Sequence, residues 1–162
     1  MFFGFSTAYG QNTTELKPSD SIKFRHSMGL AAYSDAGAGF SYRYQPNKLG
    51  FEITGSPTYI GREKLFIYSI GAKGIYNVYD GSKFDLFSYI GTHLAGYKGT
   101  AYENDRGLMN VSGIGAGMDI PIFDVLSFNF QIGYGFYVLK DSEKPADFFT
   151  TISGGFGIYY NF

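Results

Sequence analysis

Nucleophilic catalysis needs a nucleophile and a base that activates it. Because the chain contains no cysteine, a serine activated by one of the two histidines is the pair to look for. A serine two residues from a histidine on a strand would share its face and could be activated by it. Neither His26 nor His93 has a serine two positions away. Two histidines and scattered carboxylates also make a poor set of metal ligands. The sequence therefore predicts no catalytic residue, no metal and no cofactor.

A charged pair is the better candidate site. A turn at Asn47 and Lys48 would place Arg43 directly opposite Glu52 on neighbouring antiparallel strands. The other charges expected on the same interior face are Lys23, Arg25 and Lys73, with Asp119 as a candidate partner. We interpret these residues as paired charges that plug an interior. A gate or an ion path is the alternative interpretation.

The last six residues form a second pattern with a functional meaning. After Gly157, apolar or aromatic side chains occupy alternate positions at Ile158, Tyr160 and Phe162. This pattern resembles the C-terminal assembly signal of bacterial outer-membrane proteins, which the barrel-insertion machinery recognises. It departs from that signal at Phe156, where a polar residue is common. The resemblance implies that these four residues, Gly157 included, form an assembly signal.

Strands must position these residues, because polar and apolar residues alternate with period two from about residue 21 onward. Residues 126–139 are the clearest case: one face carries Leu, Phe, Ile, Tyr and Val, and the other mostly Ser, Asn, Gln and Gly. Residues 148–162 repeat the pattern. Both segments are long enough to cross a bilayer at a tilt, which takes about 9–11 residues.

The polar face of these two segments carries no charged residue. A soluble barrel would place Lys and Glu there, facing water. Small uncharged polar groups suit a narrow packed interior, so the aromatic face must point outward, where only lipid tolerates so much apolar surface. Lipid cannot satisfy the unpaired edges of an open sheet, so the strands must close. The sequence thus predicts an all-β fold, an antiparallel up-and-down transmembrane β-barrel.

Composition agrees with this fold class. Aromatic residues make up 20% of the 162 residues, and charged residues only 17%, below the usual quarter of a soluble domain. The net charge of −1 leaves no basic surface for nucleic acid. The length allows a single domain.

Turn signals, among them Pro121, and clusters of charge divide residues 22–162 into eight predicted strands. They are residues 22–34, 38–46, 49–57, 65–79, 84–98, 108–120, 126–139 and 148–162. An even number places both ends of the barrel segment on the periplasmic side. The predicted outer loops are then residues 35–37, 58–64, 99–107 and 140–147. The facing of the fifth strand stays open, because Phe87 and Tyr89 argue for one face and Ile90 and Leu94 for the other.

Glycines recur on one face of the last three predicted strands. They lie at 113, 115 and 117, at 133 and 135, and at 155 and 157. Antiparallel pairing would bring them side by side on the interior wall, where bulky Arg, Lys and Tyr from the opposite wall could fit. Packing is our interpretation, and a small ligand cavity is the alternative.

In strand pattern and terminal signal, residues 22–162 resemble the eight-stranded OmpA/OmpX-type family of outer-membrane barrels. The resemblance implies a bacterial outer-membrane location and contact with lipid and lipopolysaccharide. That family includes structural anchors, adhesins and serum-resistance proteins, and the short predicted loops argue against an adhesin. We therefore expect a non-enzymatic structural or protein-interaction role, with another envelope protein as a partner. The alternatives are an outer-membrane lipid-modifying enzyme, of the lipid A deacylase or acyltransferase type, and a soluble lipocalin-like carrier.

The first residues are expected to lie outside the barrel. Residues 1–11 are apolar and then small and polar, like the second half of a secretory signal peptide, although the usual positive n-region is missing. A short first strand or a mobile terminus is the alternative. Residues 12–21 form a polar lead-in.

Overall fold

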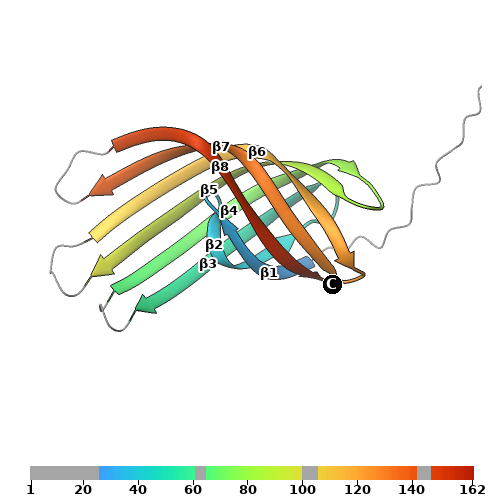
Figure 1. Cartoon of the computed structure of the whole chain (residues 1–162), viewed down its shortest axis with the longest axis horizontal. Helices are drawn as coiled ribbons and strands as arrows, with labels where there is room; N and C mark the ends of the chain where they lie inside the picture. The colour runs from blue at the N-terminus through green and yellow to red at the C-terminus, as the bar shows by residue number, and fades with distance from the viewer. Residues whose placement is uncertain (1–25, 61–64, 100–105, 142–146) are drawn as a thin grey trace, which may run out of the picture.

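The computed structural model describes residues 26–60, 65–99, 106–141 and 147–162, and these residues form eight strands. The strands are β1 (His26–Tyr33), β2 (Gly37–Tyr44), β3 (Leu49–Ile60), β4 (Leu65–Asp80), β5 (Asp85–Gly99), β6 (Arg106–Phe123), β7 (Leu126–Asp141) and β8 (Asp147–Asn161). Each strand pairs antiparallel with the next, and β8 pairs with β1. The result is a closed barrel (Figure 1), which confirms the predicted fold class.

Several strands are longer than predicted, and one turn signal is wrong. Residues 58–60, which we assigned to an outer loop, continue β3 and pair with β4. Pro121, which we took as a turn, lies inside β6 opposite Ser127. The register shifts directly after it, between Pro121 and Phe123. A proline cannot donate a ladder hydrogen bond, and a strand accommodates it at such an irregularity.

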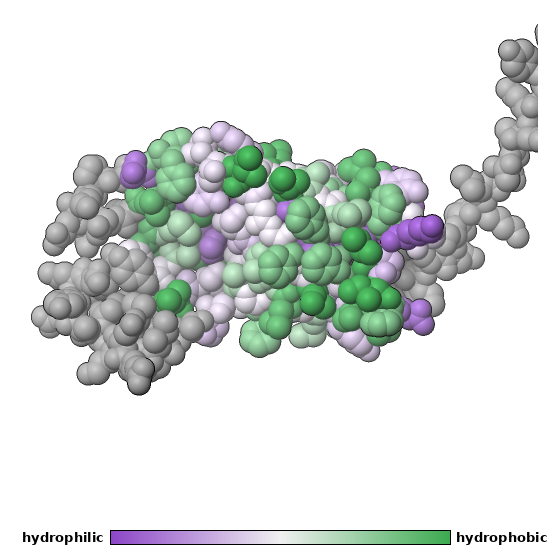
Figure 2. Space-filling model, viewed as in Figure 1, coloured by the Kyte–Doolittle hydropathy of each residue, from purple (hydrophilic) through white to green (hydrophobic). Residues whose placement is uncertain are grey.

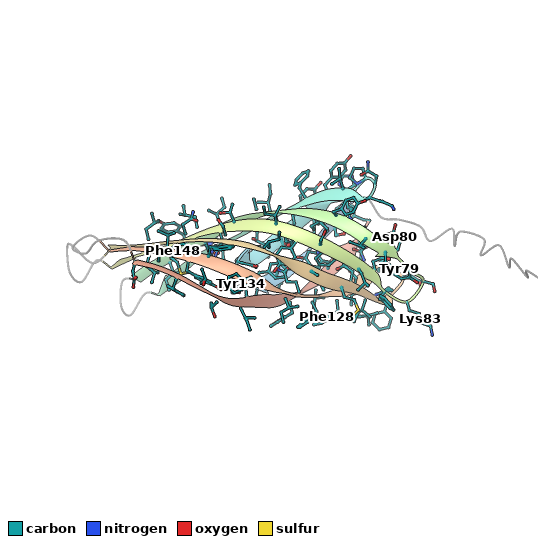
Figure 3. The ribbon with its side chains drawn as sticks, turned by 90° about the horizontal axis from the view of Figure 1, so that it is seen from above. Tyr79, Asp80, Lys83, Phe128, Tyr134 and Phe148 are labelled. Carbon is teal, nitrogen blue, oxygen red and sulfur yellow. The ribbon has the colours of Figure 1, made fainter. Side chains whose placement is uncertain are left out.

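The two faces of the wall differ as the alternation predicts. In β7 the lumen side carries Ser127, Asn129 and Gln131, all buried, while the large apolar side chains point outward. Phe128, Tyr134 and Phe148 follow one another along the length of the barrel in Figure 3. In Figure 2 hydrophobic side chains are spread over the visible wall, with the most hydrophilic ones mainly towards its two ends. The outer wall is therefore apolar along its length.

Packing in the lumen decides the facing of β5. Phe87 and Tyr89 are 1% and 3% exposed and point inward, whereas Ile90 is 66% exposed and points outward. A methyl group on Gly115 would collide with the Tyr89 ring, and one on Gly117 with the Phe87 ring. The glycine face thus makes room for bulky side chains, but near these positions the fillers are aromatic rings of the adjacent strand rather than Arg or Lys from the opposite wall.

The β1–β2 hairpin stops well short of the other strands. β1 and β2 have eight residues each, while the remaining six have 12 to 18. Figure 1 shows the six long strands continuing past this hairpin to the end of the barrel that lies away from the C-terminus. Two glycines with positive φ, Gly37 (91°) and Gly39 (126°), bend the start of β2 away from an ordinary strand path. Side chains other than glycine rarely adopt this geometry.

Because the hairpin is short, part of the wall has no neighbour on one side. β1 bonds to β8 as far as Ser34, whose backbone NH donates to the Gly154 carbonyl (3.1 Å). β2 pairs with β3 only from Phe40, opposite Gly55. Among the described strands, residues 147–153 of β8 therefore pair only with β7, and residues 57–60 of β3 only with β4. We call the opening between these two edges the side gap.

The side gap predicts an uneven pattern of amide exchange along β8. Every second backbone NH of residues 147–153 should exchange rapidly, because it points to the side without a neighbouring strand. Residues 155–161, which are paired on both sides, should be protected at almost every position. Hydrogen–deuterium exchange in detergent, read residue by residue, measures this. Uniform protection from 147 to 161 would mean that another segment covers the edge.

Candidate functional site

The core of the candidate site is an ion pair across the β2–β3 ladder. Arg43 lies directly opposite Glu52 in the register, and its Nε donates to Glu52 Oε2 (2.9 Å). Both side chains are buried in the lumen, at 5% and 1% exposure. Residues 45–48 connect β2 to β3 and leave Tyr44 opposite Phe51, so the register is the one predicted from the sequence.

Two further charged side chains bond to this ion pair, and neither belongs to the β2–β3 ladder. Arg43 Nη1 also donates to Asp119 Oδ2 of β6 (2.7 Å). Lys73 Nζ of β4 lies 3.2 Å from Glu52 Oε1. We call Arg43, Glu52, Lys73 and Asp119 the lumen network. It holds two positive and two negative groups, and it joins four strands across the barrel.

Aromatic side chains surround the two cations. The Arg43 guanidinium lies 4.5 Å from the ring centroid of Tyr159, and Lys73 Nζ lies 3.8 Å from that of Tyr33. The Tyr159 hydroxyl also donates to Glu52 Oε1 (2.8 Å). The electron-rich faces of the rings attract both cations. Rings and charges together therefore fill the cross-section at this level.

A layer of amides connects the lumen network to the rest of the interior. Asn129 Nδ2 donates to Asp119 Oδ1 (2.7 Å), and Asn129 Oδ1 accepts from the Tyr33 hydroxyl (2.8 Å). Lys73 Nζ donates to Gln131 Oε1 (2.8 Å). Buried polar groups are costly unless they are bonded. These bonds explain why β7 carries amides on its lumen face.

Sequence reasoning missed Asp35, the deepest carboxylate. We predicted residues 35–37 as an outer loop. A turn of Ser34, Asp35 and Ala36, here called the inward turn, does connect β1 to β2, but it folds into the lumen, where Asp35 and Ala36 are buried while Ser34 stays exposed. Asp35 accepts three hydrogen bonds, from the Tyr89 hydroxyl (2.8 Å), Ser153 Oγ (2.7 Å) and Gln131 Nε2 (3.1 Å). A polar residue needs such partners when it is buried.

Two glycines and a threonine hold the inward turn in place. The Thr54 hydroxyl donates to the Ala36 carbonyl. A methyl group on Gly71 would collide with that carbonyl, and one on Gly113 with the Asp35 side chain. The positive φ of Gly37 gives the chain its direction after the turn. The sequence signal for this turn was the spacing of glycines at 37 and 39, beside a single aspartate.

The structure joins each histidine to a hydroxyl that lies on another strand. His93 Nε2 is 2.9 Å from Ser69 Oγ of β4, and His26 Nδ1 is 2.7 Å from the Tyr42 hydroxyl. Searching along one strand could not find these pairs. His93 Nδ1 has no partner in the described part of the chain, so no carboxylate orients the ring as a base requires. In the same ranges, no three His, Cys, Asp or Glu residues form a group that could hold a metal.

The candidate assembly signal lies on the seam that closes the barrel. Ile158, Tyr160 and Phe162 are exposed on the outer wall, while Gly157 lies on the lumen side. The Phe162 backbone NH donates to the His26 carbonyl (2.9 Å), and its carbonyl accepts from the His26 NH (3.3 Å). Lys23 and Arg25 lie outside the described residues, as do residues 1–21.

A closed antiparallel barrel of eight strands, with a polar lumen and an apolar outer wall, is the architecture of small outer-membrane-type β-barrels, and this protein has that fold. Neisserial surface protein A is similar in structure, with a TM-score of 0.47 and 19% identity over 85% of this chain and 93% of that chain. Ail, the attachment invasion locus protein of Yersinia pestis, gives 0.39 and 14% over the same shares. At this identity the likeness concerns the fold alone. No family model and no curated protein matches the sequence.

In the described residues, no helix is long and apolar enough to span a membrane.

The lumen network predicts a large loss of stability when one carboxylate is neutralised. Glu52→Gln would leave Arg43 and Lys73 with less negative than positive charge in a buried space. Losing one partner of a buried pair costs about 3–5 kcal/mol, so the urea midpoint of the refolded barrel should fall clearly. Asp124→Asn, at an exposed turn position, is the control and should change stability by less than about 0.5 kcal/mol. Equal midpoints for E52Q and wild type would contradict the pairing.

Proposed function

We propose that this protein is a small integral protein of a bacterial outer membrane with a closed lumen and a non-enzymatic role, either structural or in binding another envelope protein. The observation that carries the proposal is the lumen network. Its four charged side chains neutralise each other and meet from four strands at one level of the barrel. Such a group blocks a passage rather than lining one.

The physical argument concerns the cost of opening. Eight strands enclose an interior just wide enough for side chains. An ion that passed this level would have to separate Arg43 from Glu52 and Asp119, which leaves buried charges unpaired. The inward turn adds a second obstruction, because Asp35 is bonded to three other side chains. The lumen network and the inward turn therefore favour the interpretation of a plug rather than that of a gate or an ion path.

The outer wall and the C-terminal strand support the proposed location and partners. Membrane lipid and lipopolysaccharide would contact the exposed apolar side chains of the wall. The barrel-insertion machinery would recognise Gly157 and the exposed stripe of Ile158, Tyr160 and Phe162. The alternative of a lipid-modifying enzyme gains little from the described residues, because the Ser69–His93 pair lacks a third residue that would orient the histidine.

The proposal predicts a membrane protein without a stable pore. The protein should fractionate with the outer membrane, show heat-modifiable migration on a gel, and give no steady conductance in planar bilayers. A variant that removes the plug, Arg43→Ala with Glu52→Ala, is the matched comparison and should conduct more if it still folds. Large, steady single-channel currents from the wild-type protein would overturn the closed lumen. Recovery as a monodisperse protein without detergent would overturn the membrane location.

The terminal stripe predicts a defect in assembly that exceeds the defect in stability. Phe162→Ala removes one exposed ring at the end of the last strand, where it stabilises the finished barrel only modestly. Recognition by strand addition depends on alternate side chains, so the level in outer-membrane fractions should fall strongly. Refolding yield in detergent should stay close to that of wild type. Phe123→Ala, another exposed ring at the same end of the barrel, is the control. Equal membrane levels for F162A and F123A would contradict the signal.

A further inference from the structure

The side gap begins where two strands, β1 and β2, end their pairing with β8 and β3. Where the wall is complete, β8 and β3 are separated by β1 and β2, which amounts to three strand spacings of about 4.8 Å, or roughly 14 Å along the wall. From Ser34 and Phe40 towards the end of the barrel that lies away from the C-terminus, β1 and β2 no longer fill the interval between β8 and β3. Residues 147–152 of β8 are exposed on both faces, as expected for a strand at an edge.

The gap lies at the level of the apolar outer wall. On the paired strand β7, Tyr134 stands opposite Ile152 and Val138 opposite Phe148, and all four side chains are exposed and point outward. Hydrocarbon cannot satisfy the free NH and CO groups of a strand edge. Within the part of the chain that the structure describes, the two edges of the gap have no neighbouring strand, so they need a polar partner at a depth where the surrounding wall is apolar.

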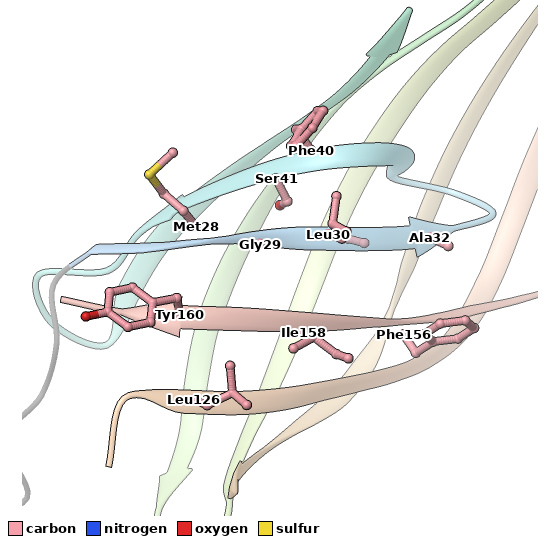
Figure 4. Close-up of a pocket in the computed structure, with 11 residues that line it drawn as sticks. Met28, Gly29, Leu30, Ala32, Phe40, Ser41, Leu126, Phe156, Ile158 and Tyr160 are labelled. Carbon is pink, nitrogen blue, oxygen red and sulfur yellow. The ribbon is translucent and has the colours of Figure 1, made fainter. Parts of the chain in front are cut away.

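An apolar groove on the outer wall leads to this gap. It has a volume of about 650 Å³, within the range of about 300–1,000 Å³ that is usual for ligand sites. We call it the outer groove (Figure 4), and its lining residues are Met28, Gly29, Leu30, Ala31, Ala32, Phe40, Ser41, Leu126, Phe156, Ile158 and Tyr160. It runs along β1, between β2 and β8. Its lining is almost entirely apolar.

The groove is hollow because small residues lie between large ones. Ala32 is exposed near the C-terminal end of β1, opposite Phe156 of β8. Phe40, 75% exposed, stands on the other side, on β2. Figure 4 shows Ala32 close to the turn of the hairpin, with Phe40 and Phe156 on either side of β1. Ser34, where the pairing of β1 ends, is two residues beyond Ala32, so the groove ends where the side gap begins.

We propose that the outer groove and the side gap together bind one lipid of the surrounding membrane, with an acyl chain in the groove and the polar head group at the gap. The groove is continuous with the outer wall that faces hydrocarbon, so the available occupant is a lipid chain. The ester carbonyls of the lipid would accept hydrogen bonds from the free NH groups of β3 and β8, and head-group donors would bond to the free CO groups. This inference rests on the proposed membrane location.

The absence of tryptophan from the chain makes the site measurable. Phe40→Trp places one fluorophore at the groove, and Ile90→Trp places one on the outward face of β5, where Ile90 is also exposed and no neighbouring strand lines the groove. Each variant is refolded in detergent and titrated with a phospholipid whose acyl chains are brominated, because bromine quenches a nearby indole. Quenching of F40W should saturate at one lipid per protein. Quenching of I90W should follow only the overall ratio of lipid to detergent.

Filling the groove tests where the lipid lies. Ala32→Phe in the F40W background should abolish the saturable quenching. Ala116→Phe, which enlarges an exposed alanine on β6, should leave it unchanged. As a check without tryptophan, native mass spectrometry should find one bound phospholipid on the wild-type barrel and on A116F but none on A32F. The same titration curve for F40W and I90W, or retention of the lipid by A32F, would overturn the site.

A separate measurement addresses the head group and the membrane location. The phospholipid should slow exchange of the alternate amides of residues 147–153, and an alkane of matched length should not. Equal effects of the two would overturn the head-group contact. In bilayers of brominated lipid, both tryptophans should be quenched. Failure of both would reject the membrane location itself, whereas equal quenching without saturable binding would reject only the lipid site.

Discussion

The neutralisation of Arg43 is the interaction on which the interior depends. This guanidinium is buried in a narrow lumen, and it bonds to carboxylates from two different strands. β2 and β3 pair over only five residues, the shortest ladder in the barrel, and Arg43 and Glu52 lie within it. The ion pair thus reinforces the place where the wall has fewest backbone bonds. Lys73, the amides of β7 and the tyrosine rings are all arranged around this charge.

Local rules explain how much of this the sequence could predict. The pleat of a strand has a period of two, so the alternation in residues 126–139 identifies both the strand and its lumen face. A short turn fixes register, so Arg43 and Glu52 could be placed opposite each other from the sequence alone. Lys73 and Asp119 could be assigned to the interior, but their partners could not be deduced. Lys73 stands opposite Glu52 in the β3–β4 ladder, whose register the sequence analysis did not fix, and Asp119 meets Arg43 from β6, a strand that only barrel closure brings near β2.

The missed features share one physical cause, which is that they depend on contacts between different strands. Alternation along β5 was uninformative because both faces carry large apolar residues, and the glycines of β6 and β7 decide which of them fit inside. The pairing of His93 with Ser69 needs two strands in register. Alternation also cannot tell where a strand leaves the wall, so the inward path at Asp35 had no local signal beyond the glycines that follow it.

The inward turn has a consequence for how this protein can change in length. Hairpin turns usually tolerate inserted residues because they end in solvent. Here Asp35 and Ala36 are enclosed by Tyr89, Gln131, Ser153 and Thr54, so added residues would have to displace packed side chains. The connection between the first two strands is therefore closed to the loop growth by which a barrel acquires new surface, and an epitope inserted there would disrupt the interior instead of being displayed.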